Sequence, residues 1–395
     1  MTDVVWIDKQ HVPREIIIKI HGWCNLACSY CYMYEAPDQS WRTKPKTMSR
    51  ETIDMTARRV AAYMREHELP SLSVILHGGE PFLAGIENIR YLVERFRSEV
   101  PPDRHLRFNI QTNGILLDEK VLDELLAIGN INVGVSLDGD ASGNHRRLFA
   151  NGRSSYEGVA RALRLFKNES YRPLLRGILS VIDLQNDPVA TYEHLLQFGA
   201  PTIDFLRPLG NWDSPPPGSY PLTQETRYAD WLIAIFDRWF NNHDGVTIRL
   251  FEQILRLVAA CAEGAEVPWY DRIELIGPWV AGAIVIEVDG SYELLDGYKT
   301  IKEAEGATGL NVYSHHLTQA LVAVLEITQS RGIPEASQTC QECLFFKICG
   351  GDFYLNRYSS ANGYHNPSVY CEDLQKLIDH IAARLAAAVK GGSQS

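Results

Sequence analysis

The chain has 395 residues, of which 45% are hydrophobic and 22% are charged, a composition typical of a globular protein with two or three domains. Its 49 acidic side chains outnumber the 38 basic ones, and the formal net charge of −11 argues against nucleic-acid binding as the main function. No stretch approaches the roughly 18 apolar residues of a membrane span, and the first ten residues lack the features of a signal peptide. We therefore expect a cytoplasmic protein, in which clustered cysteines bind metals or take part in catalysis rather than forming disulfides.

Short β-rich segments alternate with amphipathic helical segments from residue 15 to about residue 206. Six strands, each followed by a helix or a loop, indicate an α/β fold with a parallel sheet, and we expect a partial (β/α)6 TIM-like barrel. In such barrels the chemistry lies in the loops after the carboxyl ends of the strands. The predicted strands are 15–20, 72–76, 107–111, 132–137, 174–181 and 203–206, and the predicted helices are 50–66 (N-capped by Ser49), 87–97, 118–128 and 156–167.

The second half of the chain is organised differently. A turn-rich segment with four prolines, 211–221, is expected to mark the edge of the barrel. Asp289 and Gly290 predict the turn of a β-hairpin. We expect a barrel domain over 1–210, a helical linker over 211–275 and a cysteine-containing domain over 276–395. The further predicted helices are 223–241, 250–261 and 374–389.

Three of the eight cysteines, Cys24, Cys28 and Cys31, are crowded into one loop directly after the first predicted strand. Three thiolates can hold three irons of a [4Fe–4S] cluster and leave the fourth iron open to another ligand. Zinc binds four protein ligands, or three and a water molecule in catalytic sites. The spacing alone leaves both metals open.

The complete pattern is Cys24-x-x-x-Cys28-x-Tyr30-Cys31, with an aromatic residue before the third cysteine, and it resembles the cluster motif of radical S-adenosylmethionine (SAM) enzymes. This resemblance implies that the three cysteines bind a [4Fe–4S] cluster and that Tyr30 belongs to the cofactor site. It also implies that the amino and carboxylate groups of SAM chelate the open iron. A structural zinc loop is the alternative.

A second motif of the same family follows the second predicted strand. His77-Gly78-Gly79-Glu80-Pro81 resembles the GGEP motif, whose glycines let the backbone approach a ligand closely. We expect its exposed amide and carbonyl groups to pair with the methionine ammonium group. By the same resemblance, the loops after the third and fourth strands line the cofactor site, with Ser136 and Arg147 as candidate partners of the carboxylate. A solvated surface arginine is the alternative for Arg147. The cofactor-binding candidates are Tyr30, Gly78, Gly79, Glu80, Asn113, Ser136 and Arg147.

The cysteines near the C-terminus resemble the SPASM extension of peptide-modifying radical SAM enzymes, which in full has seven cysteines and two auxiliary clusters. Three expected cysteines are missing here, at Leu295, at Phe353 and near Gly282, and all three belong to one auxiliary cluster. The resemblance therefore implies one auxiliary [4Fe–4S] cluster and two clusters in total, and a zinc knuckle is the alternative. The ligands of the auxiliary cluster would be Cys340, Cys343, Cys349 and Cys371.

Residues 34–49, YEAPDQSWRTKPKTMS, resemble the segment after the cluster in FxsB-type cyclophane-forming peptide maturases, in which a DQSWR stretch recurs. The resemblance implies a radical SAM oxidoreductase that uses a 5′-deoxyadenosyl radical to join an aromatic ring carbon to a nearby β-carbon. It also implies a ribosomally made precursor peptide as substrate and a flavodoxin- or ferredoxin-type electron donor. We expect no separate leader-binding domain before the first strand, and we therefore expect a partner or the barrel–extension surface to recognise the leader.

Other reactions remain open. Sulfatase maturases oxidise a cysteine or serine side chain on a similar platform but keep the full cysteine set. Peptide epimerisation needs a thiol hydrogen donor, for which only Cys261 is spare, and its apolar helical surroundings predict a buried core thiol. An iron–sulfur or zinc scaffold protein is the non-enzymatic alternative.

Asp296 is the candidate base that removes the ring proton. It follows Leu295, at the position where the full extension has a cluster cysteine and where sulfatase maturases then have an aspartate proposed as the base. A carboxylate in a closed, partly apolar cavity is expected to be an effective proton acceptor near neutral pH. The alternative is a structural Asp296 that caps the turn into Gly297 or pairs with Lys299.

Overall fold

The computed structural model describes residues 12–218, 225–242, 244–265, 276, 283–332 and 335–392. The chain divides into two compact units. In the described ranges, no helix is long and apolar enough to cross a membrane. Unit 1 consists of Met1–Leu137, Asn144–Ile178 and Ala281–Ile327, and unit 2 consists of Asp138–Gly143, Leu179–Val280 and Thr328–Ser395.

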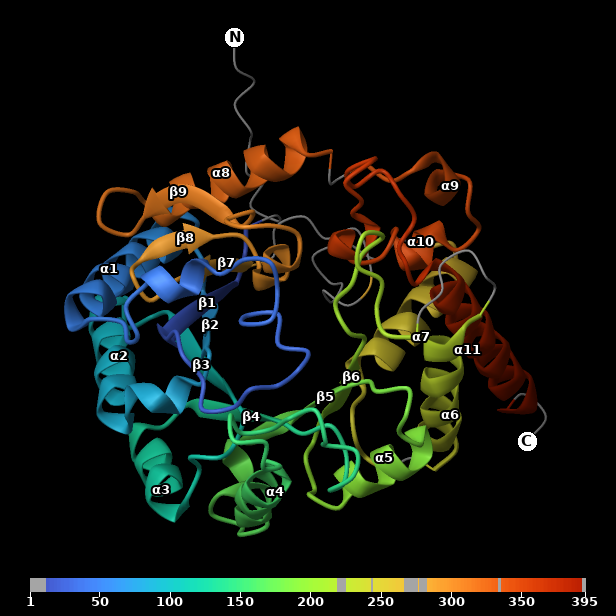
Figure 1. The fold of residues 1–395 in the computed structure, drawn as a ribbon, viewed down its shortest axis with the longest axis horizontal. Helices are drawn as coiled ribbons and strands as arrows, with labels where there is room; N and C mark the ends of the chain where they lie inside the picture. The colour runs from blue at the N-terminus through green and yellow to red at the C-terminus, as the bar shows by residue number, and fades with distance from the viewer. Residues whose placement is uncertain are drawn as a thin grey trace. The chain divides into compact units, whose positions relative to one another are not determined.

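Unit 1 is built on a sheet with the strand order β4-β3-β2-β1-β7-β8-β9 (Figure 1). Neighbouring strands from β4 to β7 are parallel, and the β7–β8 and β8–β9 pairs are antiparallel. All six predicted strands are present, so the expected α/β fold with a partial, TIM-like parallel barrel is confirmed. The strands of unit 1 are β1 (Glu15–His21), β2 (Ser71–Gly78), β3 (His105–Thr112), β4 (Ile131–Ser136), β7 (Ala283–Ile286), β8 (Ser291–Glu293) and β9 (Ala307–Asn311), and β5 (Leu175–Val181) begins there.

The helices of unit 1 follow the predicted segments closely. Ser49 caps the first of them as expected, because its Oγ accepts a hydrogen bond from the N–H of Thr52 at 3.0 Å. Asp118 caps the third in the same way, by accepting from the N–H of Val121 at 2.8 Å. The helices are α1 (Arg50–Glu66), α2 (Ile86–Glu99), α3 (Glu119–Ile128) and α4 (Tyr156–Leu165), and α8 (Leu317–Ser330) begins in this unit.

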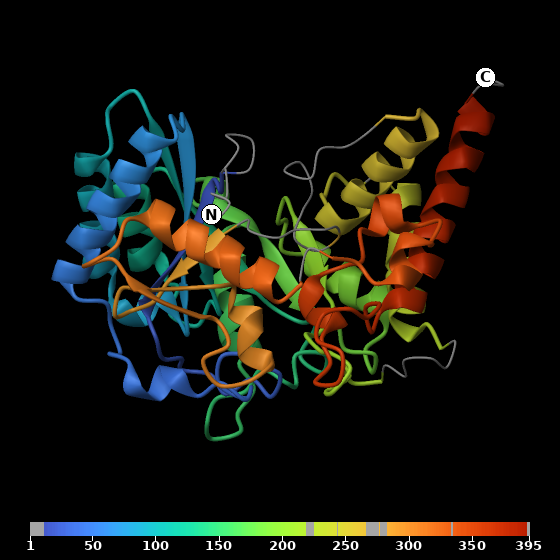
Figure 2. The ribbon, with the colours of Figure 1, turned by 90° about the horizontal axis from the view of Figure 1, so that it is seen from above.

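The two faces of the parallel strands differ in polarity. One face carries apolar side chains such as Leu76 and is covered by α1, α2 and α3 (Figures 1 and 2). On the other face, Lys19 of β1 is the register partner of His77 of β2, and Asn109 of β3 donates to Ser73 at 2.8 Å. Side chains alternate between the two faces of a strand, so the sequence of each strand supplies both a packed face and a polar one.

The predicted hairpin is formed by β7 and β8, and it belongs to unit 1. Gly290 has a φ of +83°, a conformation that favours glycine, and its N–H donates to the carbonyl oxygen of Glu287 at 2.8 Å. Because β7 pairs in parallel with β1, residues 283–327 belong to unit 1 with the barrel strands, whereas the sequence predicts one domain over 276–395. The position near Gly282, where a cysteine is missing, lies outside the described residues.

Unit 2 contains the end of β5, strand β6 and a group of helices. The rings of Tyr228 and Tyr370 lie 5.1 Å apart, and those of Phe236 and Phe251 lie 5.3 Å apart. These edge-to-face pairs join α6 to α7 and to the start of α11. The elements are α5 (Pro188–Leu196), β6 (Ile203–Leu206), α6 (Arg227–Asn242), α7 (Arg249–Ala262), α9 (Gln338–Gln341), α10 (Phe346–Cys349) and α11 (Cys371–Gly392).

Two sequence-based expectations for this region concern Cys261 and the segment 211–221. Cys261 is exposed rather than a buried core thiol, because the buried residues of α7 end at Leu257, one turn earlier. The predicted turn-rich segment 211–221 lies partly outside the described residues, and 211–218 form turns without a helix or strand.

Candidate active site

The loop after β1 carries the three N-terminal cysteines. The N–H of Cys31 donates to the carbonyl oxygen of Cys28 at 3.0 Å, which closes a turn. The N–H of Ala27 donates to the carbonyl oxygen of Leu148 at 2.7 Å, so the segment after β4 holds the loop from outside. The loop therefore has a defined backbone path that brings Cys24 and the other two cysteines to one cavity.

This cavity has a volume of about 200 Å³. Burial raises the pKa of Cys31 to about 12, so its thiol stays protonated at neutral pH unless a metal binds it. Trp41 contributes a buried indole Nε1 that has no hydrogen-bond acceptor in the described part of the chain. The lining residues are Trp23, Cys24, Leu26, Ala27, Cys28, Cys31, Tyr34, Glu35 and Trp41.

The two candidate metals differ in the ligand geometry that they require. A tetrahedral zinc site with Zn–S bonds of about 2.3 Å brings its sulfurs to about 3.8 Å from one another. Among the described residues, the sulfurs of Cys24, Cys28 and Cys31 do not form a group within 4.8 Å of one another. Three cysteine thiols on one cavity wall match the three protein ligands of a [4Fe–4S] cluster whose fourth iron is open.

The GGEP segment packs its backbone against this loop. The N–H of Gly79 donates to His21 O and the N–H of Glu80 donates to Trp23 O, both at 2.9 Å. The expectation that exposed amide groups of the motif bind a ligand is therefore corrected for these two groups. Gly78, which precedes these two residues, has a φ of +133°, a conformation that favours glycine.

We expect a Gly79→Ala substitution to damage the cysteine loop. A Cβ atom at Gly79 would lie 1.9 Å from Tyr34 Oη and 2.2 Å from Trp23 O, and the second of these is a backbone atom of the loop itself. The iron content per chain and the rate of SAM cleavage should both fall severalfold. The matched control is Gly22→Ala in the same loop, where the nearest atom to the new Cβ is Pro45 O at 3.5 Å. Equal iron content in the two variants would contradict this account of the packing.

Glu80 is fully buried and uses both of its carboxylate oxygens within the protein. Oε1 accepts from Thr112 Oγ1 at 2.7 Å, and Oε2 accepts from the N–H of Asn113 at 2.8 Å. Burial raises the pKa of Glu80, and these hydrogen bonds partly oppose the rise. Glu80 therefore positions Asn113, whose Nδ2 lies 3.5 Å from Cys24 Sγ. The sequence predicts instead that Glu80 itself binds the cofactor.

Tyr30, Arg147 and Ser136 are also brought to this end of the sheet. Arg147 is only 6% exposed and donates from Nη1 to Tyr30 Oη at 2.8 Å, so the alternative of a solvated surface arginine is wrong. Ser136 accepts a hydrogen bond from Gln111 Nε2 at 2.9 Å. All seven cofactor-binding candidates thus lie in unit 1 with the three cysteines.

Asp296 lies at the start of the 3₁₀-helix η6 (Asp296–Thr300) and is 8% exposed. Its Oδ1 accepts from Lys19 Nζ of β1, which also donates to Glu287 Oε1 at 2.5 Å. Lys299 Nζ lies 4.0 Å from the same Oδ1, so the predicted structural pairing with Lys299 is present. Asp296 is therefore surrounded by charged groups, whereas the sequence predicts a partly apolar cavity around it.

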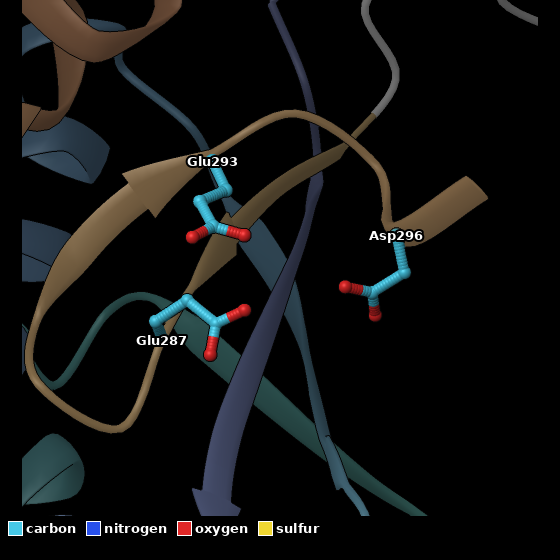
Figure 3. Close-up of side chains that lie close together, drawn as sticks. All are labelled: Glu287, Glu293 and Asp296. Carbon is cyan, nitrogen blue, oxygen red and sulfur yellow. The ribbon is translucent and has the colours of Figure 1, made fainter. Parts of the chain in front are cut away.

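These groups belong to a larger buried charge network, in which three carboxylates lie within 4.8 Å of one another (Figure 3). Three ammonium groups compensate them, so the network is neutral and needs no metal ion. Burial alone would lower the pKa of Lys19, but the carboxylates of Asp296 and Glu287 raise it above its ordinary value and keep the side chain charged. The charge network consists of Glu287, Glu293, Asp296, Lys19, Lys44 and Lys299.

The DQSWR segment joins this network to the cysteine loop. The N–H of Asp38 donates to Lys299 O at 3.2 Å, and its Oδ2 accepts from the N–H of Ala304 at 3.2 Å. Three residues later, Trp41 lines the cysteine cavity and packs edge-on against Tyr34, with ring centroids 4.9 Å apart. Lys19 Nζ also lies 3.6 Å from the sulfur of Met33, two residues after Cys31. The DQSWR segment and Lys19 therefore connect the two parts of the site.

The four C-terminal cysteines lie in unit 2, in and between α9, α10 and the first residue of α11. In the described part of the chain, no three of their sulfurs lie within 4.8 Å of one another. Gln375 of α11 donates from Nε2 to Cys371 Sγ at 3.4 Å and to Cys343 Sγ at 3.8 Å. The motif does not single out Gln375, although its i+4 spacing from Cys371 places the two side chains on one helix face.

A buried ion pair supports the same region. Arg207 donates from Nη2 to Asp352 Oδ1 at 2.7 Å, and Ser368 Oγ donates to Asp352 Oδ2 at 2.6 Å. Burial opposes ionisation of Asp352, but the Arg207 guanidinium outweighs it and holds the pKa of Asp352 below its usual range. This pair fixes the turn after Cys349, because the N–H of Asp352 donates to Cys349 O at 3.0 Å.

The fold and site define an α/β barrel protein in which three cysteines line one cavity after the first strand. Residues 18–195 match the family model of the radical SAM superfamily. This segment is therefore similar to radical SAM domains, in line with its parallel strands and its cysteine loop after β1. Domains of this kind bind SAM and a [4Fe–4S] cluster.

Curated relatives are similar to the chain over almost its whole length. It is 24% identical over 389 residues to the cysteine-type anaerobic sulfatase-maturating enzyme of Clostridium perfringens strain 13, covering 94% of this chain and 97% of that protein. It is 24% identical over 390 residues to the serine-type anaerobic sulfatase-maturating enzyme of Bacteroides thetaiotaomicron, covering 94% and 90%.

Solved structures show the same fold. The structure of native anSMEcpe with bound AdoMet superposes with a TM-score of 0.79 at 24% identity, covering 96% of this chain and 100% of that one. Streptococcus suis SuiB bound to its precursor peptide SuiA superposes with a TM-score of 0.63 at 14% identity, covering 92% and 78%. A further anSMEcpe structure contains AdoMet and the Cp18Cys peptide.

Proposed function

We propose that this chain is a radical SAM maturase that oxidises a side chain of a peptide substrate. The observation that carries the proposal is the cavity of about 200 Å³ that Cys24, Cys28 and Cys31 share in a radical SAM domain. Relatives named as sulfatase-maturating enzymes, and solved structures with bound peptides, support a peptide substrate. A scaffold protein without catalysis would have no use for an open cavity beside three thiols.

In this proposal Cys24, Cys28 and Cys31 hold a [4Fe–4S] cluster that binds SAM. When bound, this pair supplies a 5′-deoxyadenosyl radical that removes a hydrogen atom from the substrate. Asn113 orients Cys24 through its Nδ2, and the carbonyl groups of Gly78 and its neighbours are available to the SAM ammonium group. The buried cation of Arg147 is available to a carboxylate at the same end of the sheet.

The four C-terminal cysteines would hold one auxiliary [4Fe–4S] cluster. Four cysteines in one unit match the four thiolate ligands of such a cluster. Four protein ligands leave no iron open to substrate, so this cluster suits electron transfer, for which an external flavodoxin- or ferredoxin-type protein is the proposed donor to the chain. Anaerobically isolated protein should then contain about eight iron atoms per chain. About four iron atoms and one zinc would contradict the auxiliary cluster.

The curated relatives favour oxidation of a cysteine or serine side chain, as in sulfatase maturation. A carbon–carbon crosslink between an aromatic ring and a β-carbon is the second candidate, and two observations favour it. The DQSWR segment is built into the site, with Trp41 in the cavity wall and Asp38 fixed on the loop after η6. In addition, Leu295 and Phe353 occupy positions at which enzymes with the full extension have cluster cysteines.

One experiment separates these products: the chain is co-expressed with a precursor peptide encoded beside its gene, and the peptide is examined by mass spectrometry. An aldehyde that reacts with a hydrazide probe would identify cysteine or serine oxidation. A product lighter by two hydrogens, without an aldehyde and without backbone fragments between the joined residues, would identify a crosslink. Deuterium incorporation at an α-carbon without loss of mass would identify epimerisation. Unmodified peptide and no 5′-deoxyadenosine would contradict an enzymatic function.

Asp296 is the proposed base for the proton that the oxidised substrate releases. We expect Asp296→Asn to keep SAM cleavage within about twofold of wild type and to lower product formation at least tenfold, because the amide keeps the shape but cannot accept the proton. The readout is the ratio of product to 5′-deoxyadenosine.

The matched control for Asp296→Asn is Glu287→Gln, which removes the other carboxylate that Lys19 contacts. If the two variants lose product equally, the effect comes from the disturbed charge network, and Asp296 is not the base. Product formation by Asp296→Asn at the wild-type ratio would lead to the same conclusion.

A further inference from the structure

Gln375 contacts two of the four C-terminal thiols with one amide group. Its Nε2 donates to Cys371 Sγ at 3.4 Å and to Cys343 Sγ at 3.8 Å. Cys371 is the first residue of α11, and Gln375 lies one helical turn later. The two cysteines are 28 positions apart in the sequence, so only the packing of α11 brings Cys343 to the same amide.

We infer that Gln375 is a positioning residue that raises the reduction potential of the auxiliary cluster and so prepares it to accept an electron. This inference rests on the auxiliary cluster of the proposed function. Hydrogen bonds to the sulfurs of an iron–sulfur cluster stabilise the reduced form, which carries one more negative charge. An N–H donor shared by two thiolate ligands stabilises that charge at two corners of the cluster.

The charged residues near this site do not supply the stabilisation that we assign to Gln375. Arg207 lies close enough to Cys349 for its positive charge to stabilise negative charge on that sulfur. Asp352 pairs with Arg207 and offsets the positive charge. Glu372 lies beside Cys371 and opposes an additional negative charge there. The amide of Gln375 thus donates a hydrogen bond without carrying a charge. It does so at Cys371, where the negative charge of Glu372 disfavours further negative charge.

The raised potential has a direct use in the proposed reaction. After a hydrogen atom has been removed from the substrate, formation of an oxidised product releases one more electron and one proton. The electron needs an acceptor, and an auxiliary cluster in its oxidised state can take it. If this acceptor is made weaker, radicals are still generated but fewer of them lead to product.

The test uses the full-length, anaerobically isolated protein and the variants Gln375→Met and Gln375→Glu. Methionine keeps the length of the side chain without an N–H donor, and glutamate adds a negative charge next to the thiolates. The midpoint potential is measured by electron paramagnetic resonance for the cluster whose signal does not change when SAM is added. We expect the potential to fall in Gln375→Met and to fall further in Gln375→Glu.

Gln341→Met is the matched control, because Gln341 lies between Cys340 and Cys343 but donates its amide to Ala336 O at 2.8 Å. Its potential should equal that of the wild type. In D₂O, pulsed spectroscopy of the reduced auxiliary cluster should detect an exchangeable deuteron that Gln375→Met lacks and Gln341→Met retains. A purely structural role of Gln375 would not produce this difference.

The iron content separates failure of this inference from failure of the proposed function. About eight iron atoms with equal potentials in Gln375→Met and wild type would overturn the role of Gln375 and leave the auxiliary cluster in place. About four iron atoms and one zinc per chain would overturn both. With the role confirmed, the ratio of 5′-deoxyadenosine to product should also rise in Gln375→Met and not in Gln341→Met.

Discussion

Simultaneous replacement of Cys24, Cys28 and Cys31 by alanine is expected to abolish the release of 5′-deoxyadenosine from SAM. The three thiols line one cavity and lie on a loop outside the helices and strands, so their removal takes away metal ligands without opening the apolar core. Their loss should also lower the iron content from about eight to about four atoms per chain, because the C-terminal cysteines are untouched. The measurements are chromatography of the nucleoside products, iron analysis and far-ultraviolet circular dichroism.

Cys261→Ala provides the control for the triple variant. Its thiol is exposed at the end of α7, so this substitution should leave both the iron content and SAM cleavage unchanged. If the triple variant still releases 5′-deoxyadenosine at a measurable fraction of the wild-type rate, the assignment of the N-terminal cluster is wrong.

Lys19→Met is expected to lower the free energy of unfolding by about 3–5 kcal/mol, because it leaves buried carboxylates without their compensating charge. Lys19 is fully buried on β1 and contacts both Asp296 and Glu287. Methionine fills a similar volume, so the loss reports on charge rather than on packing. Urea unfolding at pH 7 measures the difference. The control is Arg95→Met, which removes a partly exposed ion pair with Asp54 and should cost less than about 1 kcal/mol.

The difference between Lys19→Met and wild type should depend on pH in a defined direction. Burial opposes ionisation of Glu287, but Lys19 and Lys44 outweigh it and lower its pKa below the usual value. A group with a lowered pKa in the folded state stabilises the fold above its unfolded pKa, about 4.3, and loses this contribution as the pH falls through its folded pKa. The two proteins should therefore differ most at pH 7 and converge as the pH falls, with the wild-type contribution of Glu287 lost below about pH 4.3. A Lys19→Met variant as stable as wild type at pH 7 would show that the charge network does not stabilise the fold.

The charge network also bears on how Asp296 would work. Asp296 lies among charged groups, because Lys19 donates to its carboxylate and Lys299 Nζ lies 4.0 Å from it. Lys19 contacts Asp296, Glu287 and the sulfur of Met33 in the cysteine loop. A change at Lys19 should therefore affect both stability and the coupling of radical formation to product, which is why Glu287→Gln is the necessary comparison for Asp296→Asn.

Local patterns in the sequence were enough to predict the parallel strands and most of the helices, and they supply the proposal for the metal ligands. Strand periodicity, the Ser49 cap and the hairpin turn at Gly290 are local signals, and each is present in the structure. The cysteine spacing is local as well, because the turn that closes at Cys28 and Cys31 needs only neighbouring residues. Helices α5 and α8 were not predicted, since packing against distant elements stabilises a helix even where its own periodicity is weak.

The partners of the polar side chains around these motifs depend on tertiary contacts, which the local sequence does not reveal. Glu80 is part of a motif, but its partners are in the loop after β3, so it positions Asn113. Lys19 sits within an apolar strand, and its partner Glu287 lies 268 positions away. Side-chain contacts of this kind depend on strand register and helix packing, which no local pattern encodes. For the same reason Asp296 lies among lysines rather than in an apolar cavity, and Gln375 reaches Cys343 only because α11 packs where it does.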